Sequence, residues 1–146
     1  MSLSAHAQNV GDISFAPGTD DPKFQLCNPN YILQGYQLKT REDETTAKVA
    51  RDFRTKFKAN DAWKNETGLI RIRFVVNCSG VADRFRLLQL DSDLKPKEFD
   101  SDLQKHILGI VKSIQWPVRR NRHQTVDYYH YFSVRIVNGQ LADVVQ

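Results

Sequence analysis

Hydrophobic and polar residues alternate most regularly in the middle of the chain, over residues 69–90. In Leu69–Val76 every second residue is large and apolar with arginines between, the period of two that is typical of a strand with one buried face. Turn-forming residues follow in Asn77–Gly80, and the alternation resumes over Ala82–Leu90. Two alternating segments joined by a short turn predict a β-hairpin. Its apolar positions are Ile70, Ile72, Phe74, Val76, Phe85 and Leu87.

Two other segments have the three- and four-residue spacing of amphipathic helices. The first covers residues 44–58, and the second is expected to begin at Phe99 or Asp100 and to end at Ile114. Pro117 follows the second helix closely, and a proline disfavours helical backbone in the residue before it. The sequence therefore predicts two helices, one on each side of the hairpin in the chain.

A long strand is expected near the end of the chain, over Thr125–Val137, because β-branched and aromatic residues alternate there with polar ones. Asn138-Gly139 then turns the chain, and Leu141, Val144 and Val145 predict a short extended tail.

The predicted order of elements is helix, strand, strand, helix, strand, which is an α+β fold. The hairpin strands are antiparallel, and the second helix returns the chain so that the last strand can pair with the first. We therefore predict a three-stranded antiparallel sheet in the order 2-1-3 with both helices on one face. The last strand would be a long open edge, which could also pair with its counterpart in a homodimer.

The first forty residues differ in composition from the rest. Residues 9–30 are rich in Gly, Pro, Asp and Asn, which favour turns and open chain. We expect an export-signal remnant and irregular N-terminal arm over residues 1–40, followed by a domain over residues 41–146.

Two features favour export. Ala5 and Ala7 form the small-x-small pattern of a signal-peptidase site, which would place the cleavage junction between Ala7 and Gln8; the alternative is a tail of small residues without such a meaning. Cys27 and Cys78 are an even pair, and in an oxidising compartment they are candidates for a disulfide; the alternative is two separate buried thiols. No run of about 20 apolar residues is present to span a bilayer.

The formal net charge of +4 permits acidic partners but does not by itself indicate nucleic-acid binding. Arginines beside tyrosines on a sheet could stack bases, or hold an acidic envelope polymer such as peptidoglycan. The plainer interpretation is a solvated sheet face, and we expect nucleic acid to be the weaker candidate partner. The predicted basic patch consists of Arg71, Arg73, Arg84 and Arg86.

The sequence carries no recognisable catalytic motif. No Ser or Cys nucleophile motif accompanies the four histidines, and His130 has the strand parity of the buried Phe132. Without a CxxC motif or a Cys/His cluster, a structural zinc site is not expected. We therefore predict a non-enzymatic protein that needs no cofactor or metal. The histidines are His6, His106, His123 and His130.

The motifs from Gly68 to the end of the chain occur in the order and spacing found in the C-terminal domain of TonB-type proteins. The chain resembles that family over about residues 67–146, and the turn over Val76–Gly80 resembles versions of the domain from Bacteroidetes. The matching motifs are Gly68-x-x-x-Ile72-x-Phe74-Val75-Val76, Gly80-Val81, Trp116-Pro117, Tyr131-Phe132-Ser133-Val134 and Asn138-Gly139.

The resemblance implies a periplasmic or cell-envelope domain that binds a short extended peptide of a TonB-dependent outer-membrane transporter. Such a peptide would add as a strand to the open edge of the sheet. Residues 9–66 lack the proline-rich spacer of TonB-type proteins, which favours a stand-alone binding module. The edge residues that the resemblance implies are Tyr129, Tyr131, Ser133, Arg135 and Val137.

Overall fold

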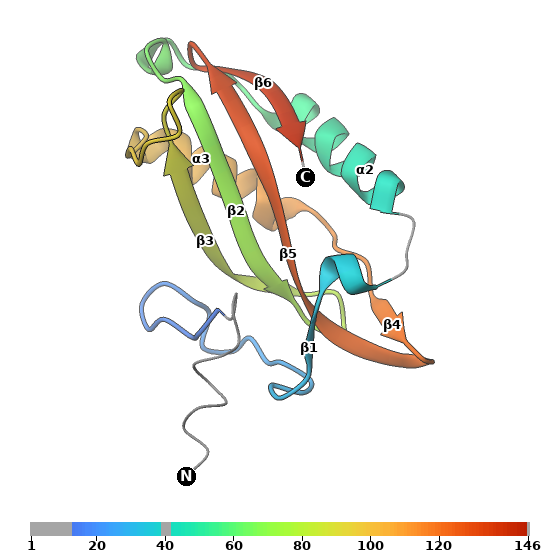
Figure 1. Ribbon diagram of the computed structural model, residues 1–146. Helices are drawn as coiled ribbons and strands as arrows, with labels where there is room; N and C mark the ends of the chain where they lie inside the picture. The colour runs from blue at the N-terminus through green and yellow to red at the C-terminus, as the bar shows by residue number, and fades with distance from the viewer. Residues whose placement is uncertain (1–12, 39–41, 146) are drawn as a thin grey trace.

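A single long strand, β5 (Gln124–Val137), organises the computed structural model, which describes residues 13–38 and 42–145 (Figure 1). β5 pairs antiparallel with β2 (Gly68–Val76), and β2 pairs antiparallel with β3 (Ala82–Leu90). The long alternating patterns therefore form strands as predicted, and the last predicted strand pairs with the first one of the hairpin.

Three further short strands pair with β5, and because of them the three-stranded sheet predicted from the sequence is wrong. β1 (Ile32–Gln34) pairs with β5 in parallel, while β4 (Arg119–Asn121) and β6 (Gln140–Val145) pair with it antiparallel. Over the described residues the sheet is six-stranded and mixed rather than three-stranded and antiparallel. Asn138 and Gly139 both have positive φ, 51° and 75°, so the turn after β5 brings the tail back as a paired strand.

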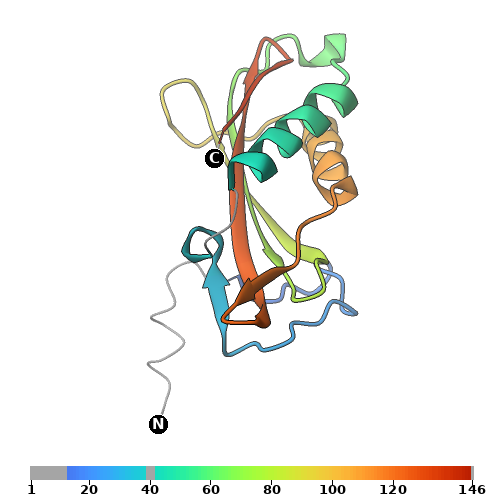
Figure 2. The ribbon, with the colours of Figure 1, turned by 90° about the vertical axis from the view of Figure 1, so that its right-hand side faces the viewer.

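The two α-helices of the described residues lie on one side of the sheet (Figure 2). They are α2 (Glu42–Lys56) and α3 (Ser101–Ser113). The Asp100 carboxylate caps α3 by accepting hydrogen bonds from the N–H groups of Asp102 and Leu103, which explains where that helix begins. Two 3₁₀ turns, η1 (Gly35–Gln37) and η2 (Asp61–Trp63), connect these elements to the strands. No helix among residues 13–38 and 42–145 is long and apolar enough to cross a membrane.

The main core lies between the helices and the inner face of the sheet. Alternate residues of β2 and β5 point into it, and the apolar stripe of α3 packs against them. The residues of β2 that point the other way lie on what we call the outer face, opposite the helices. The central core residues are Phe53, Ile70, Ile72, Phe74, Leu103, Ile107, Val111, Phe132, Val134 and Ile136.

Candidate functional site

Residues 13–30, which we call the arm, lie over one end of the outer face. The arm forms a second, smaller core in which Ile13 packs with Val75 of β2 and Tyr129 of β5. Phe24 and Leu26 pack against the same cluster. The segment that sequence composition marks as irregular is therefore folded onto the sheet, at the lower end of the strands in Figure 1.

Cys27 and Cys78 form the disulfide that was a candidate from the sequence, and it joins the arm to the turn between β2 and β3. Their Cα atoms are 6.0 Å apart, and the bond closes a loop with a sequence separation of 51 residues. The bond therefore restrains the arm at its C-terminal end. A disulfide of this kind is compatible with an exported protein.

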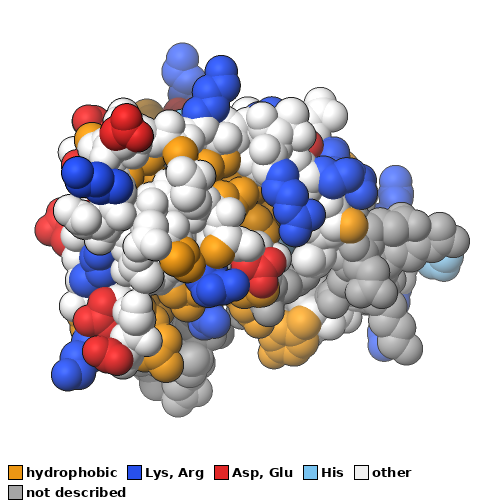
Figure 3. Space-filling model, turned by 90° about the horizontal axis from the view of Figure 1, so that it is seen from above, with side chains coloured by type: hydrophobic (Ala, Val, Ile, Leu, Met, Phe, Trp, Pro, Cys, Tyr) orange, Lys and Arg blue, Asp and Glu red, His pale blue; other side chains and the backbone are white. Residues whose placement is uncertain are grey.

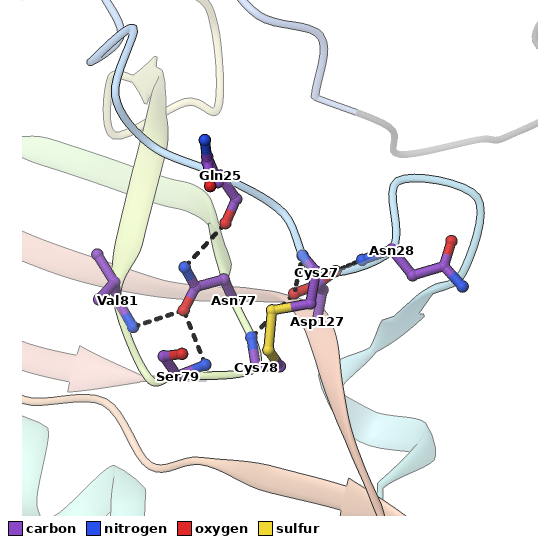
Figure 4. The surroundings of a disulfide bond; sticks show 8 residues. All are labelled: Gln25, Cys27, Asn28, Asn77, Cys78, Ser79, Val81 and Asp127. Carbon is purple, nitrogen blue, oxygen red and sulfur yellow. Dashed lines mark hydrogen bonds between the residues drawn. A yellow bond between two sulfur atoms is a disulfide. The ribbon is translucent and has the colours of Figure 1, made fainter.

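A buried carboxylate holds both ends of this disulfide (Figure 4). Asp127 is 1% exposed, and its Oδ1 accepts hydrogen bonds from the backbone N–H groups of Cys27 at 3.1 Å and Cys78 at 2.9 Å. Its Oδ2 accepts a third from Asn28 at 2.8 Å. Because both sulfur atoms are bonded to each other and both carboxylate oxygens accept N–H groups, this cluster has the chemistry of a structural clamp.

Two of the four arginines of the predicted basic patch hold the arm in place. Arg86 forms an ion pair with Asp20 at 2.6 Å and donates a hydrogen bond to the Ser14 carbonyl. This hydrogen-bonded pair lowers the pKa of the Asp20 carboxyl, because Arg86 favours its charged form. Arg84 donates to the Ile13 carbonyl at 3.0 Å, and its guanidinium lies 5.9 Å from the centre of the Phe24 ring. Arg84 and Arg86 therefore bind the arm, which distinguishes them from Arg71 in the predicted patch.

The edge of β5 that sequence reasoning left open is occupied by the chain itself. Ser133, Arg135 and Val137 are paired with β6, and Tyr129 is paired with β1. Of the five predicted edge residues, only Tyr131 has no paired neighbour on that side among the described residues. Strand addition along Tyr129–Val137, whether by a partner peptide or by a second copy of the chain, therefore does not fit this structure.

Beyond the arm, three cross-strand rows remain on the outer face, and we call them the open face. The first row is Leu90, Leu69, Arg135 and Asp143, and the second is Leu88, Arg71, Ser133 and Val145. The third row is Arg86, Arg73 and Tyr131, and it borders the arm through Arg86. Several of these apolar side chains contact solvent, since Leu88 is 50% exposed, Val145 is 41% exposed and Tyr131 is 37% exposed. Exposed apolar side chains grouped in this way mark interaction surfaces more often than isolated ones do.

Arg71 lies across the centre of the open face. Its guanidinium is 5.3 Å from the centre of the Tyr131 ring, and its Nε donates to the Ser133 hydroxyl at 3.4 Å. Arg135 is exposed and lies opposite Asp143 in the strand register. No ion pair joins Arg71 or Arg135 to a carboxylate within residues 13–38 and 45–145, whose side chains the structure describes. Both guanidinium groups can therefore bind an anion from outside the chain.

His130 points into the main core and not toward the open face. Its ring lies 5.3 Å from that of Trp116, and burial together with the positive charge of Arg119 lowers the pKa of His130 to about 4. The guanidinium of Arg119, itself buried, lies 5.2 Å from the centre of the Tyr128 ring. These side chains form a polar inclusion within the core, with the histidine neutral at physiological pH.

His106 and His123 lie apart from His130. His106 is in α3, and its Nε2 accepts a hydrogen bond from the Lys58 N–H at 3.0 Å. His123 is exposed in the turn between β4 and β5. The remaining histidine, His6, and the predicted cleavage junction at Ala7 lie outside the described residues.

Comparison with known proteins adds no relative to this description. No protein-family model, curated protein or solved structure matches the chain.

Sequence reasoning missed the residues that define where the open face ends. Asp127 belongs to β5 and contacts Asn28, 99 positions earlier, and Asp20 contacts Arg86 across 66 positions. Contacts between residues so far apart leave no local pattern in the sequence that could predict them. One signal was available: Asp127 is the only acidic residue in Gln124–Val137 and lies between Val126 and Tyr128, and an acidic residue that is buried among such neighbours needs partners.

Proposed function

We propose that this protein is a binding module of the cell envelope that holds an extended, acidic segment of a partner protein on its open face. The observation that carries the proposal is that the open face places arginines beside exposed aliphatic side chains. Arg71 and Arg135 offer charge that no carboxylate of the described chain neutralises, and Leu88 and Val145 offer apolar contact beside them.

This combination favours a protein segment over a polyanion. A polyanion is recognised by a dense set of cations, and binding to it depends steeply on salt. Arg84 and Arg86 bind the arm, so fewer arginines are left on the outer face than the sequence predicts. The exposed leucine and valine have no role in contacting phosphates or sugar acids, whereas apolar groups flanked by arginine are common in protein interfaces.

The cell-envelope setting is supported by three features of the chain. They are the disulfide between Cys27 and Cys78, the small-x-small pattern at Ala5 and Ala7, and the resemblance to TonB-type C-terminal domains. A segment of an outer-membrane transporter is the partner that the resemblance implies. Because β6 occupies the edge of β5, we propose that the segment binds across the face of the sheet and not along that edge.

Peptide selection tests the proposal without knowledge of the natural partner. A random-peptide phage library is selected against the wild-type protein, and the best peptides are titrated by fluorescence anisotropy against the double variant Arg71→Glu/Arg135→Glu. The selected peptides should combine Asp or Glu with aliphatic residues, and the double variant should weaken them by at least about tenfold, because each reversal replaces attraction by repulsion.

The matched control is Arg54→Glu/Arg120→Glu, which makes the same charge change at exposed positions on α2 and β4. Apart from a small loss caused by long-range electrostatics, the affinity of this control for the peptides should stay within about twofold of the wild type. Peptides without acidic residues that bind both double variants equally well would contradict the proposal. Binding of single-stranded nucleic acid or peptidoglycan fragments, with a steep loss in salt, would replace it with the polyanion alternative.

A further inference from the structure

The open face ends in a pocket at the top of the sheet. The pocket has a volume of ≈ 330 Å³ and lies between the first residues of β2, the last residues of β5 and the loop that follows β3. Seen from above, hydrophobic side chains reach the surface at this end of the molecule between charged ones (Figure 3). Its apolar lining comes from Leu69, Leu94, Ile136 and Val137.

Leu94 forms a wall of this pocket and is held in an unfavourable conformation. It is 70% exposed and has a φ of 62°, a left-handed backbone that a leucine rarely adopts. Asp91 stabilises the loop: its Oδ1 accepts hydrogen bonds from the N–H groups of Asp93 at 2.8 Å and Lys95 at 2.9 Å, and its carbonyl accepts one from Leu94 at 3.0 Å. The apolar wall is therefore fixed before any partner binds.

Arg135 connects the pocket to the open face, because it lines the pocket and also belongs to the first row. Its guanidinium has no ion pair with the described part of the chain. A ligand with an apolar group in the pocket and a carboxylate beside that group could therefore contact the apolar lining and Arg135 together. Asp91 also lines the pocket, and its Oδ1 already accepts the two loop N–H groups.

The spacing of the two arginines adds a second requirement on the partner. Arg135 is the neighbour of Leu69 across the strands, and Arg71 is two residues further along β2, so the two positions are diagonal neighbours about 7–8 Å apart. In an extended peptide, side chains on the same face are two residues and about 6.6–6.8 Å apart. Acidic residues at alternate positions of a partner segment thus match the two arginines.

We propose that this pocket is an anchor site for one leucine-sized aliphatic side chain of the partner segment, with Arg135 binding a carboxylate next to it and Arg71 binding a second one two residues further on. The inference rests on the proposed function and specifies the chemistry of its partner. The occupant is an extended segment with an aliphatic residue at one end and alternating acidic residues after it.

A small probe tests the anchor site separately from the selected peptides. N-acetyl-leucine carries both the isobutyl group and the carboxylate, and it is titrated into the ¹⁵N-labelled full chain. We expect amide shifts at Leu69, Leu94 and Val137, with a dissociation constant on the order of 1–10 mM for so small a ligand. N-acetyl-leucinamide lacks the charge and should bind at least about threefold more weakly, and N-acetyl-alanine should bind more weakly than N-acetyl-leucine because it fills less of the pocket.

The variant Arg135→Gln separates the two contacts. It should reduce binding of N-acetyl-leucine to the level of the amide, while leaving the amide itself unchanged. Since Arg135 is exposed, the variant is expected to fold, which the dispersion of its spectrum checks. Shifts at other residues, or equal affinity of acid and amide for the wild type, would overturn the anchor site. The proposed function would survive that result if the selected peptides still lose affinity in Arg71→Glu/Arg135→Glu.

Discussion

Asp127 accepts a hydrogen bond from the backbone N–H of Cys78 at 2.9 Å, and the same oxygen accepts one from Cys27, the other half of the disulfide. One buried carboxylate thus fixes the backbone on both sides of the covalent bond. The arm and the turn between β2 and β3 are held together by this unit, and the arm in turn determines how much of the outer face stays open.

Removal of the Asp127 carboxylate should destabilise the protein even with the disulfide intact. Asp127→Ala leaves three partly buried N–H groups without an acceptor, and we expect a loss of about 2–4 kcal/mol in the free energy of unfolding. Asp127→Asn keeps one acceptor oxygen and should lose roughly half as much. Urea unfolding measures both variants. Equal stability of Asp127→Ala and the wild type would show that the clamp does not contribute.

Loss of the disulfide should release the arm. Cys27→Ser/Cys78→Ser removes a bond that spans 51 residues, and chain entropy alone predicts a loss of roughly 4 kcal/mol. Limited proteolysis should then cut within residues 13–30 before it cuts the sheet. Intact mass without and with reductant establishes the bond in the wild type. Cleavage of the double variant at the wild-type rate would mean that the ion pair of Arg86 with Asp20 suffices to hold the arm.

His130 should make the protein less stable in mild acid. Its pKa falls from 6.5 to about 4 on folding, so between these two values the unfolded chain binds a proton that the folded chain does not. The free energy of unfolding should therefore decrease as the pH falls from 6.5 to 4, by about 3 kcal/mol in total, and this contribution should be constant below pH 4.

His130→Phe is the variant that isolates this effect. Its free energy of unfolding should change less over the same pH range, with a smaller change in the same direction left from His106, whose pKa is also lowered by burial and by Lys58. Denaturant titrations at intervals of half a pH unit provide the comparison. Parallel pH profiles for the variant and the wild type would rule out His130 as the cause.

Two glycines should respond oppositely to alanine. Gly68 has a φ of 151°, and a Cβ there would lie 2.1 Å from the Leu90 carbonyl oxygen, so Gly68→Ala should lose more than about 3 kcal/mol of stability. Gly109 is in α3, where an added Cβ would meet no atom within 4 Å, so Gly109→Ala should gain about 1 kcal/mol from helix propensity. Thermal unfolding ranks the two variants, and a stable Gly68→Ala would contradict the close approach of β2 to the end of β3.

The sequence predicted the long elements because their patterns extend over many residues. β2, β3 and β5 each have nine or more residues in which alternation is visible, and α3 has both its cap and its stripe in the sequence. β1 and β4 have three residues each, too few for a period to show. The turn before β5 uses Arg122 and His123 at φ 51° and 72°, where no Gly or Asn marks a hairpin.

Only part of the candidate site could be predicted from the sequence, because some of its contacts are long-range. The side of the sheet on which Arg71 and Arg135 lie follows from the alternation of side chains along a strand, which is a local pattern. The contacts of Arg84 and Arg86 with the arm are long-range and are fixed by tertiary folding, so four similar arginines received the same interpretation from the sequence. The open edge of β5 was predicted because the tail after Asn138-Gly139 was treated as an addition and not as a pairing strand.

Chemical-shift mapping with a selected acidic peptide shows whether the open face is the surface that binds it. The ¹⁵N-labelled protein is titrated with the peptide, and the perturbed amides are placed on the sheet. We expect the largest shifts to cluster on the open face, around Arg71, Tyr131 and Arg135, and to disappear in Arg71→Glu/Arg135→Glu. Shifts confined to β6, as strand addition at that outer edge would give, or to the helices, would contradict this expectation.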